Sequence, residues 1–141
     1  RRVYFDNTTT TEGSKGSIGI EYLLGNTHVA PIENIMKRDW SLYSGIEFYV
    51  KSDHPEELRF CIFDSNKKDD PTMDEWQASY SAGTDWKKIR IYFSNMSLNL
   101  TRKGDRVLSL DLVEIFKFYA SPNFTKPGTT GTFWIDEIKL F

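Results

Sequence analysis

Hydrophobic and polar residues alternate along most of the chain, and this period of two is the strongest pattern in the sequence. It is clearest in six runs, at 17–23, 45–51, 57–64, 86–93, 114–120 and 131–141. Because successive side chains of a β-strand point to opposite faces of its sheet, each run predicts a strand with one buried face. In the last run the apolar spacing lengthens from two to three between Ile135 and Ile138, which predicts a β-bulge beside Asp136.

Two weaker runs, at 28–35 and 74–81, also predict extended segments. Clusters of Gly, Pro, Asn and Asp separate the runs, as is typical of turns. No long stretch has a helical period, and residues 109–116 allow a single turn at most. Eight or more short strands in 141 residues predict an all-β fold, a two-sheet antiparallel β-sandwich (jelly roll) that forms one domain over residues 1–141.

The composition is ordinary for a globular protein except in its aromatic content. Charged residues make up 27% and the net charge is −2 without any basic block, so neither nucleic acid nor a membrane is an expected partner. Aromatic residues make up 15%, more than a core of this size needs, which suggests that some rings face outward for binding. The chain begins without Met, and we interpret it as a module of a larger protein.

Candidates for catalysis are scarce, and the sequence does not predict an enzyme. A single Cys61 excludes an internal disulfide, and two histidines disfavour a zinc site. There is no Ser-His-Asp spacing and no glycine-rich phosphate loop, and acids such as Asp70 and Asp74 lie in or beside a predicted loop, as solvated carboxylates do. A ligand-binding module and a protein-interaction or assembly module both remain open, because a sandwich fold does not decide function.

Five motifs follow one another in an order that is moderately specific: "DWSLYSGIEFYVKSD", "LRFCIFD", "DEWQASYSAGTDWKKIRIYFSNM", "LSLDLVEIFKFYASP" and "GTFWIDEIKLF". This series resembles the β-jelly-roll carbohydrate-binding modules of bacterial plant-cell-wall hydrolases, most closely the family 11 type and its relatives. The resemblance implies one sheet with strands near 18–24, 46–51, 87–93 and 133–141. It implies a second sheet with strands near 28–35, 58–64, 75–81 and 115–120.

The resemblance also implies a function, namely non-catalytic binding of a soluble β-glucan chain on the concave outer face of the second sheet. The ligand would be a β-1,4 glucan, a mixed β-1,3-1,4 glucan or a xyloglucan. The module would be a monomer, secreted to the extracellular space with an attached glycoside hydrolase that it directs to cell-wall polysaccharide. The chemistry of sugars agrees, since a pyranose has an apolar C–H face that suits an aromatic ring and a rim of hydroxyls that suits polar side chains.

Side chains along a strand face the core and the solvent in turn, and we call this alternation strand parity. Together with the resemblance, it selects the expected carbohydrate-binding residues. If Phe60 and Ile62 face the core, then Arg59 and Phe63 face outward, and the same parity exposes Tyr119, the expected stacking residue. The remaining positions match binding positions, strand starts or a loop of the family. The full set is Tyr119, Lys117, Arg59, Phe63, Trp76, Gln77, Glu75, His28, Arg102 and Asp105.

Two points stay open at the level of sequence. Trp76 is either a core residue or a stacking platform near the end of its strand. Parity on the other sheet turns Tyr49, Tyr92 and Trp134 outward, and these rings would form either a contact with a neighbouring module or the true binding face.

Modules of this group often hold a structural Ca²⁺ where the N-terminal segment meets the last strand. Asp6, Glu12 and Asp136 lie in the corresponding segments, and carboxylate oxygens suit a hard cation. The resemblance therefore implies a calcium site at these three residues.

Overall fold

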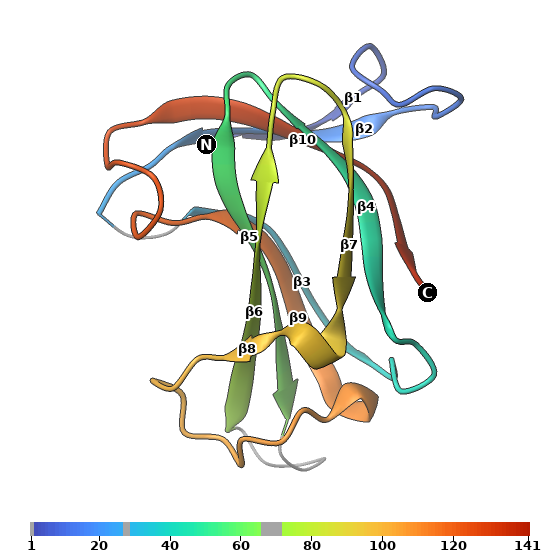
Figure 1. The fold of residues 1–141 in the computed structure, drawn as a ribbon, viewed down its shortest axis with the longest axis vertical. Coiled ribbons are helices and arrows are strands. Elements are labelled where there is room, and N and C mark those ends of the chain that lie inside the picture. Colours follow the sequence, from blue (N-terminus) through green and yellow to red (C-terminus); the bar gives the residue numbers. More distant parts are fainter. Residues whose placement is uncertain (1, 27–28, 66–71) are drawn as a thin grey trace.

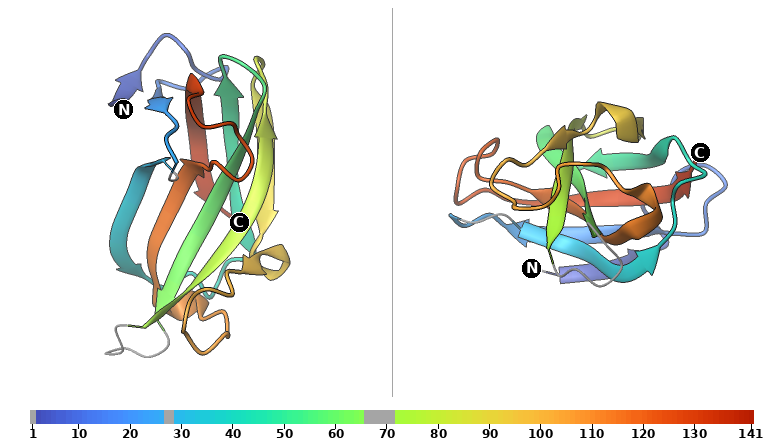
Figure 2. Two further views of the ribbon diagram at one scale, coloured as in Figure 1. Left: turned by 90° about the vertical axis from the view of Figure 1, so that its left-hand side faces the viewer. Right: turned by 90° about the horizontal axis from the view of Figure 1, so that it is seen from below.

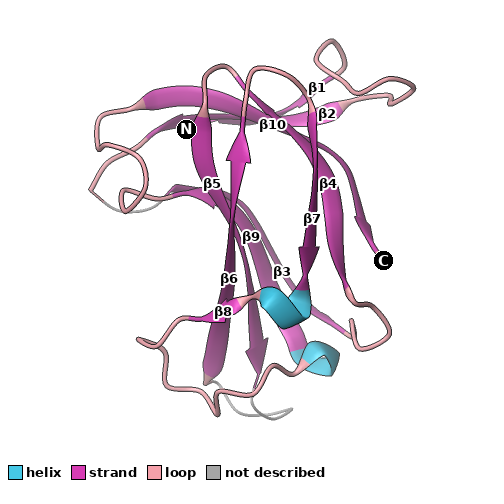
Figure 3. Ribbon diagram, in the orientation of Figure 1, coloured by secondary structure: helices cyan, strands magenta, loops and turns pink. Residues whose placement is uncertain are grey.

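A computed structural model describes residues 2–26, 29–65 and 72–141. In that part of the chain ten strands alternate with loops and two short 3-10 turns (Figures 1 and 3). The strands are β1 (Arg2–Asp6), β2 (Ser17–Leu23), β3 (Val29–Arg38), β4 (Gly45–Ser52), β5 (Glu56–Ser65), β6 (Met73–Ala82), β7 (Lys87–Tyr92), β8 (Ser97–Leu98), β9 (Val113–Ala120) and β10 (Thr130–Leu140). The 3-10 turns are η1 (Phe93–Asn95) and η2 (Leu110–Leu112). None of the described helical segments is long and apolar enough to cross a membrane.

The strands form two five-stranded antiparallel sheets that face each other (Figure 2). The first sheet has the order β1-β2-β10-β4-β7, and the second has the order β3-β9-β5-β6-β8. The predicted sandwich is therefore confirmed, and so is the assignment of the eight predicted strands to their two sheets. Strands β1 and β8 at the sheet edges were not predicted.

The core lies between the sheets and is built from the alternate apolar positions of the strands. Phe48, Phe60, Phe118 and Phe133 are fully buried there. The rings of Phe48 and Phe118, from opposite sheets, meet edge-on with centroids 4.9 Å apart, an arrangement that aromatic pairs favour. Full burial of four phenylalanine rings explains why the period of two is so regular along these strands.

The last strand contains the bulge that the sequence predicted. Its register against β4 shifts between Asp136 and Lys139, and Glu137 has a φ of 48°. The extra residue turns Asp136 toward the loop between β1 and β2, where its carboxylate is buried. Beyond the bulge β10 pairs again with β4, and Phe141 closes the sheet through backbone bonds to Ser44 and Gly45.

Candidate functional site

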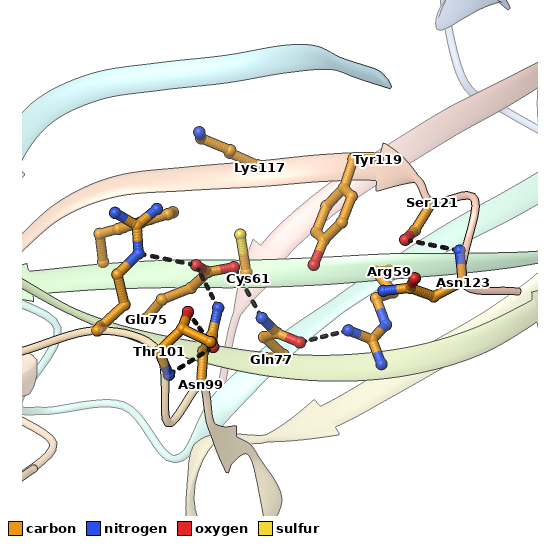
Figure 4. Close-up of a pocket in the computed structure, with 12 residues that line it drawn as sticks. Arg59, Cys61, Glu75, Gln77, Asn99, Thr101, Lys117, Tyr119, Ser121 and Asn123 are labelled. Carbon is orange, nitrogen blue, oxygen red and sulfur yellow. Dashed lines mark hydrogen bonds and ion pairs between the residues drawn. The ribbon is translucent and has the colours of Figure 1, made fainter. Parts of the chain in front are cut away.

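A pocket of about 290 Å³ lies on the outer face of the second sheet, and we call it the face pocket (Figure 4). Its floor comes from β5, β6 and β9, and its walls come from the loop between β8 and η2 and from the loop between β9 and β10. The residues that line it are Arg59, Cys61, Phe63, Glu75, Gln77, Asn99, Thr101, Arg102, Lys117, Tyr119, Ser121 and Asn123.

Strand register explains why side chains so distant in sequence meet on this floor. Cys61 of β5 lies opposite Lys117 of β9 on one side and opposite Gln77 of β6 on the other. Arg59 lies opposite Tyr119 in the next row of the same face. Because partners across a ladder share a face, the outward parity of β5 fixes that of β6 and β9.

The floor of the pocket is a small apolar cluster, separate from the main core. Cys61, Phe63 and Tyr119 point outward but are 1%, 4% and 6% exposed. Cationic groups cover the Phe63 ring, with the Arg102 guanidinium carbon 5.0 Å and the Lys117 ammonium 4.8 Å from its centroid. Such cation–π contacts shield the ring from water.

Tyr119 presents its hydroxyl, rather than an open ring face, to the pocket (Figure 4). Burial and the nearby Cys61 thiol raise the pKa of the Tyr119 hydroxyl to about 12, against the lowering effect of its hydrogen bond with Arg59. The hydroxyl therefore stays protonated and neutral in the physiological range. The expectation of an exposed stacking ring at Tyr119 is wrong, because neighbouring side chains of the sheet pack against that ring.

The buried carboxylate of Glu75 organises the polar part of the pocket. It accepts hydrogen bonds from Gln77 Nε2 at 2.8 Å, Asn99 Nδ2 at 3.0 Å and Arg102 Nε at 3.2 Å. Gln77 Oε1 in turn accepts a hydrogen bond from the Arg59 guanidinium. Because Glu75 is only 8% exposed, these charge-assisted bonds fix the orientation of two amides and two guanidinium groups along the floor.

The wall between β9 and β10 carries an exposed aromatic ring at the rim. The backbone N–H groups of Phe124 and Thr125 donate to the carbonyl of Ser121, and Thr125 Oγ1 donates to the buried carboxylate of Glu56. These bonds hold Phe124, which is 44% exposed, with the Arg59 guanidinium carbon 4.1 Å from its ring centroid. Phe124 is thus an anchored aromatic ring beside the pocket, which the sequence reasoning did not consider.

Two buried aspartates, paired across β5 and β6, anchor the wall between β8 and η2. Asp64 accepts hydrogen bonds from Trp76 Nε1 at 3.2 Å and from the backbone N–H of Ser109. Asp74 accepts a 2.6 Å bond from the backbone N–H of Arg106, which has a φ of 64°. Burial raises the pKa of Asp64 to about 6, although the bonds from Ser109 and Trp76 oppose this and the Asp74 charge adds to it.

The structure brings seven of the predicted site residues together in the face pocket: Arg59, Phe63, Glu75, Gln77, Arg102, Lys117 and Tyr119. His28 lies outside the described residues. Asp105 is exposed on the same loop as Arg102 but does not line the pocket, because the loop turns and its carboxylate accepts a bond from the Val107 N–H. Asp105 therefore lies outside the face pocket, and its role in binding stays a prediction.

Trp76 is the second correction. It lies opposite Ile62 in the β5–β6 ladder and packs against the main core, and its indole N–H donates to Asp64. This is the core alternative that the sequence left open, and it removes Trp76 from the stacking role. The indole still contributes to the pocket indirectly, because it helps to hold the carboxylate that anchors a wall.

Several pocket residues were missed by sequence reasoning, namely Asn99, Thr101, Ser121 and Asn123. All four lie in loops, where alternation gives no parity. Cys61 had the correct outward parity but was not chosen as a ligand contact. Its alternation with Arg59 and Phe63 is the only signal in the sequence that could have selected it.

The outward aromatics of the first sheet do not form an open platform. The Trp134 indole N–H donates to Asp6 at 3.0 Å. Tyr92 packs edge-on against Phe141 with centroids 5.2 Å apart, and the Arg90 guanidinium carbon is 5.4 Å from the Tyr92 centroid. Neighbouring side chains thus engage the Trp134 and Tyr92 rings, although Tyr92 is still 42% exposed.

The carboxylates of the predicted calcium site are surrounded by hydrogen-bond donors. Asp136 accepts bonds from the Thr11 N–H, the Thr11 hydroxyl, the Ser14 hydroxyl and the Glu137 N–H at 2.8–3.0 Å. These bonds satisfy both oxygens and tie the β1–β2 loop to the bulge of β10. Because N–H and O–H groups surround the Asp136 carboxylate, these surroundings do not fit a cation.

The other two predicted ligands, Asp6 and Glu12, have different surroundings from each other. The Thr8 hydroxyl, together with the N–H groups of Thr9 and Thr8, holds the pKa of Asp6 well below its ordinary value, and Glu12 is exposed. Within the described ranges no group of three or more His, Cys, Asp or Glu side chains is placed to hold a metal ion. The calcium site stays a prediction.

Comparison with protein families identifies one family for this chain. A family model described as "Carbohydrate binding domain (family 11)" matches residues 8–141. A search of curated proteins finds no match.

Solved structures share the fold at low sequence identity. A family 11 carbohydrate-binding module from Clostridium thermocellum, in complex with a β-1,3-1,4-mixed-linked tetrasaccharide, is 22% identical with a TM-score of 0.75, and the match covers 99% of this chain and 82% of that one. A family 30 module of a cellulosomal cellulase from the same organism is 15% identical, with a TM-score of 0.70 and coverage of 99% and 81%. A chain of an exo-β-agarase is 13% identical with a TM-score of 0.68, and the match covers 99% of this chain but 22% of the agarase.

Proposed function

Because the chain belongs to family 11 of the carbohydrate-binding domains, we propose that its face pocket binds a soluble β-glucan chain. The domain is non-catalytic, and its ligand is a β-1,4 or mixed β-1,3-1,4 glucan or a xyloglucan. The complex of the similar family 11 module with a mixed-linkage tetrasaccharide supports this choice. We further propose that the domain works outside the cell, attached to a glycoside hydrolase that it holds on cell-wall polysaccharide.

One observation carries the proposal, namely the network centred on Glu75 beside the rings of Phe63 and Tyr119. Amide, guanidinium and phenol groups give and accept the hydrogen bonds that the hydroxyl rim of a pyranose needs. Their orientation is fixed before the ligand arrives, so little side-chain entropy is lost on binding. A sugar ring that displaces Arg102 or Lys117 from Phe63 would gain an apolar surface for its C–H face.

Neutral glucan gives the pocket no charge to attract, so its binding should depend little on ionic strength. The affinity should be moderate, because an open pocket of this size excludes water from only part of a polysaccharide.

The proposal can be tested by affinity electrophoresis through gels that contain soluble mixed-linkage β-glucan. The wild-type domain should be retarded. Tyr119→Phe removes one pocket hydroxyl and should weaken binding by about 0.5–1.5 kcal/mol, which is roughly a two- to tenfold loss of affinity. Tyr80→Phe is the matched control, since Tyr80 also lies on the second sheet but is buried in the core.

Retention of full affinity by Tyr119→Phe, or equal losses in both variants, would contradict the placement of the glucan in this pocket. A wild-type domain that migrates freely through every soluble polysaccharide would favour the alternative, a protein-interaction or assembly module on the same sandwich.

A further inference from the structure

A second cavity of about 340 Å³ lies beside the face pocket, and we call it the edge cavity. It is lined by Gln77, Ala78 and Ser79 of β6 and by Arg90, Ile91 and Tyr92 of β7, together with Arg59 and the polar side chains of the η1–β8 segment. It opens here because β8 pairs with β6 only at Trp76 and Gln77. Beyond Gln77, the edge of β6 faces the last strand of the first sheet.

The two cavities form one continuous surface. Arg59 and Gln77 line both of them, and the hydrogen bond between these two residues forms the boundary. A polysaccharide chain in the face pocket that extends past Arg59 would therefore reach the edge cavity.

The edge cavity has a distinctive charge. Two arginines, Arg59 and Arg90, are among its described lining residues, and no Asp or Glu is. The other polar members are neutral: Gln77, Ser79, Tyr92, Asn95 and Ser97. An anion that enters this cavity meets two positive charges and several neutral hydrogen-bond donors.

Among the described residues Arg59 has no carboxylate ion-pair partner, whereas Arg90 forms one ion pair, with Glu47. Arg59 Nε is buried without a hydrogen-bond partner, while its guanidinium carbon lies 4.1 Å from the Phe124 ring centroid. Arg90 Nε is 3.9 Å from Glu47, whereas Lys88 and Lys139 approach the same carboxylate to 3.3 and 3.4 Å.

Aromatic contacts hold both guanidinium groups in place. The Arg90 guanidinium carbon is 3.9 Å from the Phe141 ring centroid. The Arg59 guanidinium carbon is 4.1 Å from the Phe124 ring centroid. Guanidinium groups that stack on rings keep their N–H edges available for an acceptor in the plane. The planar fork of an arginine matches a carboxylate, which accepts two parallel N–H bonds.

We propose that the edge cavity binds the carboxylate of an acidic sugar, a uronate unit, on the polysaccharide whose neutral part occupies the face pocket. The inference rests on the proposed function, because the neutral part of the chain brings the uronate to Arg59. Arg59 and Arg90 bind the carboxylate, and the serine and asparagine side chains bind the hydroxyls of the same sugar.

The experiment compares a soluble mixed-linkage β-glucan with the same polymer partly oxidised at C6, which converts some glucose units to glucuronate. Calorimetric titration at low salt should show the wild-type domain binding the oxidised polymer on the order of tenfold more tightly, since charge-assisted bonds are about twice as strong as neutral ones. The preference should shrink as salt is added, while binding of the neutral polymer should change little.

Arg90→Gln should abolish the preference and leave binding of the neutral glucan unchanged, because Arg90 does not line the face pocket. Lys88→Gln is the matched control, since Lys88 lies on the same strand and also contacts Glu47 but does not line the edge cavity. It should keep the preference. Asn95→Asp, which adds a carboxylate to the cavity, should reduce the preference for the oxidised polymer.

Equal affinities of the wild-type domain for the two polymers would overturn this inference and leave the proposed function intact. The same holds if Arg90→Gln retains the preference, or if Lys88→Gln loses it to the same extent, which would assign the effect to general surface charge. Failure to bind either polymer would instead refute the proposed function itself.

Discussion

Asp64 makes the stability of the domain depend on pH in a direction opposite to that of ordinary surface carboxylates. Its side chain is fully buried, and burial raises the pKa of the native state to about 6 from the ordinary value of 3.8. The native state therefore holds a proton that the unfolded state releases between these two values. By linkage, the contribution of Asp64 to the free energy of unfolding falls as pH rises from about 4 to about 6 and is constant above that range.

The magnitude follows from the separation of the two pKa values. One pKa unit corresponds to about 1.36 kcal/mol, so a native value of about 6 against 3.8 corresponds to about 3 kcal/mol over the full titration, of which about 2 kcal/mol falls between pH 4 and pH 7. Other groups act against this trend. The pKa of Asp39 is lowered by the Ser41 hydroxyl and N–H, so Asp39 adds stability that is lost as pH falls through its native value.

A difference measurement separates Asp64 from these groups. We expect urea unfolding, followed by tryptophan fluorescence at pH 4, 5, 6 and 7, to show wild type losing about 2 kcal/mol relative to Asp64→Asn as pH rises. Asp111→Asn, which changes an exposed aspartate of η2, should run parallel to wild type at every pH. A constant difference between wild type and Asp64→Asn would refute the reasoning.

Two further predictions concern stability. Tyr80→Phe should raise the free energy of unfolding by about 1–3 kcal/mol, because the Tyr80 hydroxyl is buried without a hydrogen-bond partner. Thermal or urea melts measure this change. A loss of stability would show that the hydroxyl forms a hydrogen bond in solution. The calcium prediction requires a higher melting temperature in calcium than in EDTA, since a cation that binds only the native state stabilises it. Equal melting temperatures would refute it and would agree with the donors that already surround Asp136.

The sequence predicted the strands well because each has to bury one face. Ile62 and Phe60 alternate with outward residues so regularly that the parity of β5, and through the ladder that of its neighbours, could be assigned in advance. The bulge of β10 could also be assigned, because a strand whose apolar spacing slips from two to three must insert a residue to keep the same face buried. Strand β8 could not, because two residues carry no period, and β1 lies at an edge where Phe5 is 70% exposed.

The site was only half predictable, for a different physical reason. Parity states that Tyr119 points away from the core, but it does not state that neighbouring side chains cover the ring. Loop residues were beyond reach because long-range bonds set their positions, such as Asn99 to Glu75 and Thr125 to Glu56. Alternation describes how a strand meets its sheet, whereas a pocket depends on which loops fold back over it.

Strand β7 is the last described strand of the first sheet, so its outer edge has no described partner in that sheet and is a template on which a second copy of the chain could add a strand. Within its six residues it carries Lys87, Lys88 and Arg90. Two copies that approach along this edge bring like charges together, which opposes edge-to-edge pairing and fibril growth. Arg90 thus protects the fold against aggregation as well as lining the edge cavity, and a variant that neutralises all three side chains would become less soluble even if its sugar binding were untouched.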